Sequence, residues 1–365
     1  MKRYIRVSLL LGSIALANTG NGQEARPVGG KTFIDYVKPM PIVGGLSTTV
    51  WGASEVGARD PKNGLEDATM TKWNYWDGQI LKGKDGKYHM FASRWPQAKG
   101  HMNWYDSKAV HAVSENLFGP YEDKGLLWPD NEEGKGHNVT ALVLPDGRYA
   151  VVISETRPGN VFVSDSLDGP WTYHGQMEVA DNEFKHLGVK KNGFMSNVSI
   201  IVRPDGNFQI VSRSGAILIS KNGILGPYVV QGPSIYQVMP WRQPLIGLED
   251  PVLWFSGGLY HIIVNKYNER RAYHLTSVDG IRDWKYRGVA YDATTDFARY
   301  SDGTVNHWHK LERPGVVIEN GHVVALTLAV MDTPKNTQKG NNGHGSKVVV
   351  LPVDGAALDR DLVGK

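Results

Sequence analysis

The chain has 365 residues, of which 41% are hydrophobic and 42 are glycine, enough for one large all-β domain or two smaller ones. The formal net charge is +3, but residues 1–22 hold three basic residues and no acidic one, and the rest balances at 37 against 37. A balanced chain gives no electrostatic reason to expect a nucleic-acid or membrane partner. The lack of cysteine excludes a disulfide framework and a thiolate metal site.

The N-terminus has the pattern of a secretory signal peptide. Lys2 and Arg3 precede a short apolar run at residues 7–17, and small and polar residues follow. The run is too short for a stable membrane anchor. We therefore expect residues 1–22 to be a signal peptide, residues 23–60 to be an extended N-terminal arm, and the product to be secreted or periplasmic.

A hairpin pattern recurs five times along the rest of the chain. Each copy has a strand-like run, a turn dipeptide that tolerates positive φ angles, and a second strand-like run. The turns are Asp85-Gly86, Asp146-Gly147, Asp205-Gly206, Gly257-Gly258 and Asn320-Gly321. A third strand follows in each unit, and four units then carry a turn that ends in Tyr121, Trp171, Tyr228 or Trp284.

Five matched units predict an all-β fold, a single five-bladed β-propeller over residues 61–365. Two sandwich domains are the structural alternative, but they do not explain five units. The last unit lacks a clear fourth strand, so we expect the N-terminal arm to supply it and close the ring.

The first strand of each blade lines the channel of a propeller, so equivalent residues there converge. A step of eleven residues back from the aromatic or apolar residue that follows each turn gives Asp77, Asn138, Asn197, Glu249 and Glu312. All five are polar and each heads an apolar strand, which indicates a shared polar pocket. Glycosidic-bond cleavage suits it, because that reaction needs one ionised and one protonated carboxyl group.

The unit pattern, with Trp76-Asp77-Gly78 in the first blade and Glu249-Asp250-Pro251 in the fourth, resembles the five-bladed propeller glycoside hydrolases of families 43 and 117. By that resemblance Asp77 corresponds to the general base and Glu249 to the general acid. Family 43 has a third, tuning Asp where this chain has Asn197, so Asp250 or Glu312 must take that role or the chemistry differs. The family 117 pattern favours Asp250 as catalytic and a histidine as the acid.

The candidate catalytic residues are therefore Asp77, Glu249 and Asp250. Aromatic rings that stack on sugar faces, and polar or arginine side chains near the strand ends, supply the candidate substrate-binding residues. These are Trp76, Arg94, Trp95, His137, Asn138, Asn197, Trp241, Glu312 and Arg313. The loop over residues 94–105 is a further subsite candidate.

No metal site is predicted and no cofactor is required, although the resemblance allows a structural calcium ion in the channel, on a histidine such as His137. His307 and His309 are a weaker metal candidate. Four other histidines lie inside predicted second or third strands and are expected to be structural: His89, His111, His261 and His274.

The function that these patterns favour is an exported, exo-acting glycoside hydrolase that removes a terminal sugar from plant or algal oligosaccharides. One alternative is a polysaccharide lyase in which His137 and an arginine act on a uronate. The other is a propeller that binds carbohydrate without catalysis, which the two asparagines in the ring make plausible. The expected partner is an oligosaccharide, with no nucleic acid and no membrane.

Overall fold

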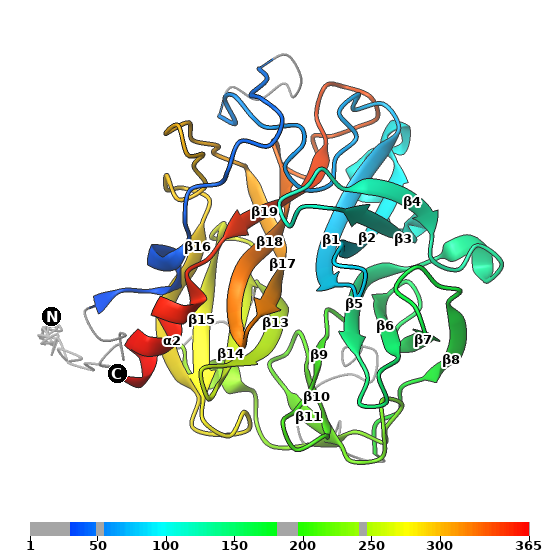
Figure 1. The fold of residues 1–365 in the computed structure, drawn as a ribbon, viewed down its shortest axis with the longest axis vertical. Coiled ribbons are helices and arrows are strands. Elements are labelled where there is room, and N and C mark those ends of the chain that lie inside the picture. The colour runs from blue at the N-terminus through cyan, green and yellow to red at the C-terminus, as the bar shows by residue number, and fades with distance from the viewer. Residues whose placement is uncertain (1–29, 49–54, 181–195, 241–246, 365) are drawn as a thin grey trace, which may run out of the picture.

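The computed structural model describes residues 30–48, 55–180, 196–240 and 247–364. Five antiparallel sheets surround a central channel (Figure 1), which confirms the predicted five-bladed propeller. The innermost strands contact one another in ring order, β1 to β5, β9, β13, β17 and back to β1. The predicted signal peptide lies outside the described residues. No described helix is long and apolar enough to cross a membrane.

The first two blades have four strands each, paired in chain order. Blade 1 comprises β1 (Trp73–Lys82), β2 (Tyr88–Pro96), β3 (Lys108–Ser114) and β4 (Glu122–Leu126). Blade 2 comprises β5 (His137–Val143), β6 (Tyr149–Glu155), β7 (Asn160–Ser164) and β8 (Thr172–Gln176).

The other three blades follow the same order. Blade 3 comprises β9 (Ser199–Val202), β10 (Phe208–Val211), β11 (Ile217–Ser220) and β12 (Val229–Val230). Blade 4 comprises β13 (Leu248–Ser256), β14 (Leu259–Lys266), β15 (Arg271–Ser277) and β16 (Lys285–Asp292). Blade 5 comprises β17 (Lys310–Glu319), β18 (His322–Met331) and β19 (Ser346–Pro352), and the helix α2 (Gly355–Val363) follows it.

Short 3-10 turns complete the described elements. They are η2 (Phe33–Tyr36), η3 (Gln97–Lys99), η4 (His101–Asp106), η5 (Glu132–Gly134) and η7 (Ile235–Val238). The predicted turn dipeptides all join a first strand to a second, and their glycines have positive φ angles between 57° and 88°. The four aromatic residues that end the later turns are buried.

The segment before β1 closes the ring, but not as the predicted fourth strand from the arm over residues 23–60: it makes single contacts, and those with β19 come from just beyond that arm. Leu65 forms an isolated bridge with Val348 of β19, and the Asn63 side chain bonds both backbone groups of Val350. Val37 forms a second bridge with Val353, just beyond β19. Within the described residues these contacts take the place of a continuous fourth strand. They satisfy backbone groups at an edge that is otherwise open to unwanted pairing.

Candidate active site

A polar pocket of about 290 Å³ lies where the first strands enter the channel. Eight residues predicted from the sequence line it: Trp76, Trp95, His137, Asn138, Asn197, Glu249, Asp250 and Glu312. His101 and Trp104, from the predicted subsite loop over residues 94–105, also line it, and the structure adds Glu155, Ser196, Arg213 and Lys335. Residues from all five blades therefore converge on one pocket.

In each blade, one non-glycine residue with a positive φ angle lies in the first strand or just before it. These residues are Asp77, Asn138, Asn197, Asp250 and Arg313, with φ between 47° and 70°. A β-bulge or break in register follows in blades 1, 4 and 5. Because L-residues rarely adopt this conformation outside Asn and Asp, its recurrence at a pocket indicates that the surrounding structure imposes it.

The eleven-residue step back is therefore correct in blades 1 to 3 and one residue too long in blades 4 and 5. The ring holds Asp250 and Arg313 in place of Glu249 and Glu312. The reason is hairpin length, since Lys82 pairs with Tyr88 across the blade 1 turn, whereas Ser256 pairs directly with Leu259 in blade 4. Glu249 and Glu312 still reach the pocket from one position earlier.

Arg313 joins two of the buried carboxylates beneath the pocket. Its Nε donates to Asp77 Oδ1 at 2.9 Å, and its Nη1 donates to Asp250 Oδ1 at 3.4 Å. The Oδ2 atom of Asp77 accepts from Ser93 Oγ and from the backbone N–H of Val139, the latter at 3.3 Å. Burial raises the pKa of Asp250 to about 6, and the positive charge of Arg313 limits that rise. Three blades are thus tied by one buried ion-pair chain.

Glu249 differs from these groups because it is held towards the protonated form. Burial, together with the negative charges of Asp250 and Glu312, raises its pKa to about 8, although Lys335 and Arg213 act in the opposite direction. Arg213 Nη2 lies 3.0 Å from Glu249 Oε2, and the Glu249 side chain is 13% exposed. A carboxyl group with a raised pKa beside ionised partners is the usual arrangement of a general acid.

Glu312 has its charge compensated by two lysines. Lys310 Nζ lies 3.4 Å from Glu312 Oε1, and Lys335 forms an ion pair with Oε2. Lys335 also lies over the Trp76 ring, 4.9 Å from its centroid, and nearby carboxylates raise the pKa of this partly exposed amine. Lys335 is therefore a permanent positive charge in the pocket wall.

The pH dependence of stability should report the protonation of Glu249. Its folded pKa is raised, so the folded protein holds this proton to a higher pH than the unfolded chain, and the free energy of unfolding falls as pH rises towards about 8. Histidines such as His137, whose pKa burial lowers to about 4, still contribute in this range because they titrate near pH 6.5 in the unfolded chain, but that contribution is the same in wild type and Glu249→Gln. Between pH 6.5 and 8.5 we expect the wild type to lose about 1–2 kcal/mol of stability relative to Glu249→Gln.

Urea unfolding at the two pH values measures this loss directly. Glu155→Gln is the matched control, because it removes a carboxylate of the same pocket that lies outside the cluster of Glu249, Asp250 and Glu312. An equal pH dependence in wild type and Glu249→Gln contradicts the assignment.

The opposite wall of the pocket offers hydrogen-bond acceptors beside aromatic rings. Ser107 Oγ donates to Gly136 O at 3.0 Å, so the 2.9 Å contact between Ser107 Oγ and His137 Nδ1 requires that His137 donates. This leaves His137 Nε2 as an acceptor, with the Trp104 ring stacked 5.0 Å away. Asn138 donates to Asn197 Oδ1 at 2.6 Å, and its own buried Oδ1 has no partner among the described residues. A ligand rich in hydroxyl groups fits such a wall.

The remaining candidates lie elsewhere. Arg94 does not line the pocket; it forms an ion pair with Asp123 and its guanidinium carbon lies 4.4 Å from the centre of the Trp73 ring. Trp241 lies outside the described residues. Sequence reasoning missed Glu155, Ser196, Arg213 and Lys335, which sit at strand ends or in loops without any recurring motif.

A cation could be bound by the carboxylates of Glu249, Asp250 and Glu312, whose oxygens lie within 4.8 Å of one another. Arg313, Lys335 and Lys310 already contact this cluster and supply positive charge to it. The donor set therefore gives no reason to place a channel calcium ion here.

No model of a known protein family matches the sequence, and no curated protein is similar to it. Solved structures are similar in fold. A family 117 glycoside hydrolase from the marine bacterium Zobellia galactanivorans aligns with a TM-score of 0.54 at 14% identity, over 86% of this chain and 91% of that one. A family 43 β-xylosidase/α-arabinofuranosidase from a compost metagenome aligns with a TM-score of 0.51 at 14% identity, over 77% and 92%. This chain has their propeller fold.

The resemblance expected from the sequence is thus confirmed as a shared fold. Another structure, named as a glycoside hydrolase, has a TM-score of 0.53 at 15% identity and is matched over 62% of its length. Because one fold hosts many reactions, the activity has to be argued from the pocket itself.

Proposed function

We propose that the protein is a glycoside hydrolase in which Glu249 is the general acid and Asp77 the ionised base. The observation that carries this proposal is a carboxyl group with a pKa of about 8 in the pocket wall, together with a second carboxylate that is bound to Arg313 beneath the pocket. The acid protonates the leaving oxygen while the ionised group activates water. Asp77 Oδ1 has Arg313 as its partner and keeps a lone pair for that water.

Asp250 and Glu312 are proposed to replace the tuning carboxylate of family 43, where this chain has Asn197. Their negative charges are the largest contributions after burial to the raised pKa of Glu249. Asn197 accepts a hydrogen bond from Asn138 and so contributes to the polar wall. Asp250 and Glu312 therefore keep the pKa of Glu249 raised, although Asn197 stands where family 43 has an Asp.

An exo mode of action on oligosaccharides suits the dimensions and lining of the pocket. A volume of about 290 Å³ is near the lower end of the range for small-molecule sites, roughly 300–1,000 Å³. That space suits a terminal sugar residue, with Trp104 and His137 as the stacking and acceptor wall. The compost enzyme of similar fold is solved with xylotriose, which supports an oligosaccharide from plant or algal material. Export remains part of this proposal on the N-terminal pattern.

Two observations weigh against the alternatives. A lyase that acts on a uronate must bind an anion, yet the basic side chains in the pocket wall, Arg213 and Lys335, are already paired with Glu249 and Glu312. A module that only binds sugar has no need for a buried acid held towards protonation by neighbouring carboxylates. The hydrolase accounts for both features.

Release of free monosaccharide from a panel of plant and algal oligosaccharides tests the proposal. The wild-type protein is expected to release one sugar, and Asp77→Asn to lose activity by at least about 10²-fold, because it loses the base. Product absorbing in the ultraviolet without free monosaccharide indicates the lyase. Equal release by both proteins removes Asp77 as the base.

A further inference from the structure

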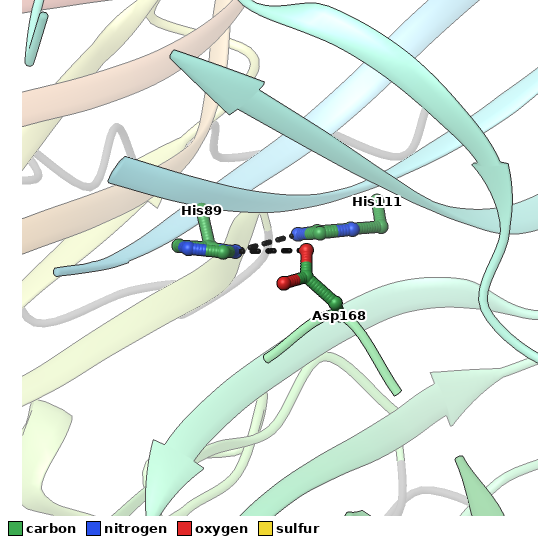
Figure 2. A group of neighbouring side chains, drawn as sticks. All are labelled: His89, His111 and Asp168. Carbon is green, nitrogen blue, oxygen red and sulfur yellow. Dashed lines mark hydrogen bonds and ion pairs between the residues drawn. The ribbon is translucent and has the colours of Figure 1, made fainter. Parts of the chain in front are cut away.

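A second cluster of polar side chains lies between blades 1 and 2, outside the pocket. His89 of β2 and His111 of β3 are buried, and their facing atoms, Nδ1 and Nε2, are 2.9 Å apart. Asp168, in the turn before β8, lies 3.8 Å from His89 Nδ1. Figure 2 shows its carboxylate directed at the gap between the two imidazole rings. All three donor atoms fall within 4.8 Å of one another.

The outer nitrogen of His89 is already engaged. His89 Nε2 lies 3.4 Å from Asp85 Oδ1, in the turn between β1 and β2. A carboxylate there favours the tautomer with the proton on Nε2, which leaves a lone pair on Nδ1 facing His111. Carboxylate partners on the outer nitrogen are characteristic of histidines that bind metals. Burial and the neighbouring His89 also lower the pKa of His111 to about 4, so His111 is neutral at physiological pH.

Blade 4 contains the same histidine pair without the carboxylate. His261 Nδ1 and His274 Nε2 are 3.0 Å apart, on β14 and β15, with the same interstrand offset. Asp359 approaches this pair only from the other side, 3.8 Å from His261 Nε2, and Trp254 stacks on His261 at 4.8 Å. The pair alone is therefore a packing feature of the blades. Asp168 and an adjoining open pocket of about 220 Å³ distinguish the blade 1 pair.

We infer that His89, His111 and Asp168 form a binding site for a divalent transition-metal ion of the Zn²⁺ class. Imidazole nitrogens and a carboxylate oxygen are ligands that such ions accept, at distances of about 2.0–2.2 Å. Two nitrogens 2.9 Å apart subtend an angle of about 90° at a shared ion with bonds of that length. An opening of about 0.4 Å gives the tetrahedral angle that zinc prefers. Water or Asp165, which lines the same pocket, completes the coordination.

The bound ion would join two blades that are otherwise held here by packing. His89 and His111 belong to blade 1, while Asp168 precedes the outer strand of blade 2. The competing occupant of the gap is a proton, with His111 donating to His89 or a charged His89 lying between Asp85 and Asp168. The two occupants differ in their need for Asp168: a metal ion requires its carboxylate as a ligand, whereas the hydrogen bond between the histidines does not.

Isothermal titration of the full chain, without a polyhistidine tag, with Zn²⁺ alone tests the site. We expect one ion per chain, an increase in melting temperature on binding, and no competition from equimolar Mg²⁺ or Ca²⁺, which prefer oxygen ligands. Asp168→Asn and His111→Gln are each expected to weaken binding at least about tenfold. The glutamine amide can still donate a hydrogen bond to His89, so the pair contact survives.

Two matched controls separate ligand loss from general damage. His274→Gln makes the same substitution in the blade 4 pair, and Asp146→Asn removes the same charge from another turn of blade 2, where Asp146 pairs with Arg148. Both are expected to bind Zn²⁺ as the wild type does. Absence of saturable binding overturns the inference, as does full retention of binding in Asp168→Asn and His111→Gln, which would place the ion elsewhere, such as at His307.

Discussion

Glu249→Gln is expected to lower kcat on the natural oligosaccharide by about 10²–10⁴-fold, the usual contribution of proton transfer by a positioned acid. Glutamine keeps the shape of the side chain but cannot give up a proton to the leaving oxygen. The expectation rests on the burial and the neighbouring carboxylates that hold Glu249 in its protonated form.

The loss of activity in Glu249→Gln should depend on the leaving group of the substrate. A purely structural role of Glu249 would not produce that dependence. On a nitrophenyl glycoside of the released sugar, the leaving group departs without protonation, so Glu249→Gln should retain most of its activity. Glu155→Gln, in the same pocket with a hydrogen bond to Ser196, is expected to affect both substrates equally. Equal losses on both substrates in Glu249→Gln would mean that another group is the acid.

The fold could be predicted because its signals are local and repeated. Each Gly-containing turn specifies a hairpin by itself, and five such hairpins at similar spacing have few architectures available. The closing contacts of Asn63 and Leu65 could not be predicted, since they form over more than 280 residues of sequence separation and leave no local pattern.

The candidate site was predictable where the strands carry it and not where loops do. Asp77, Asn138 and Asn197 follow from the repeat. In blades 4 and 5 the repeat points to the residue one position before Asp250 and Arg313, because hairpin length varies between blades. Lys335 comes from the connection between β18 and β19, so only the folded structure shows that it reaches Glu312. The histidine pairs show the same dependence on loops. The strand patterns contain both pairs, but only the folded structure shows that Asp168, from a turn, lies beside the blade 1 pair.

Arg313→Met is expected to destabilise the protein by about 3–5 kcal/mol, because it leaves Asp77 and Asp250 buried without their shared cation. Methionine retains much of the side-chain volume, and the Arg313 side chain is only 8% exposed, so the loss is mainly one of charge. Arg213→Met is the matched control: its side chain is 44% exposed and contacts Glu249, and we expect a change of less than about 1 kcal/mol. Urea unfolding at pH 8 measures both.

The double variant Arg313→Met with Asp77→Asn decides whether the cost is electrostatic. If the cost comes from unpaired carboxylates, removing one of them restores part of the lost stability, so the two effects are not additive. The cost should also shrink at pH 5, because Arg313 lowers the pKa of Asp250 and its loss lets that carboxyl take up a proton more readily. Additive losses that do not depend on pH would show that Arg313 contributes packing alone.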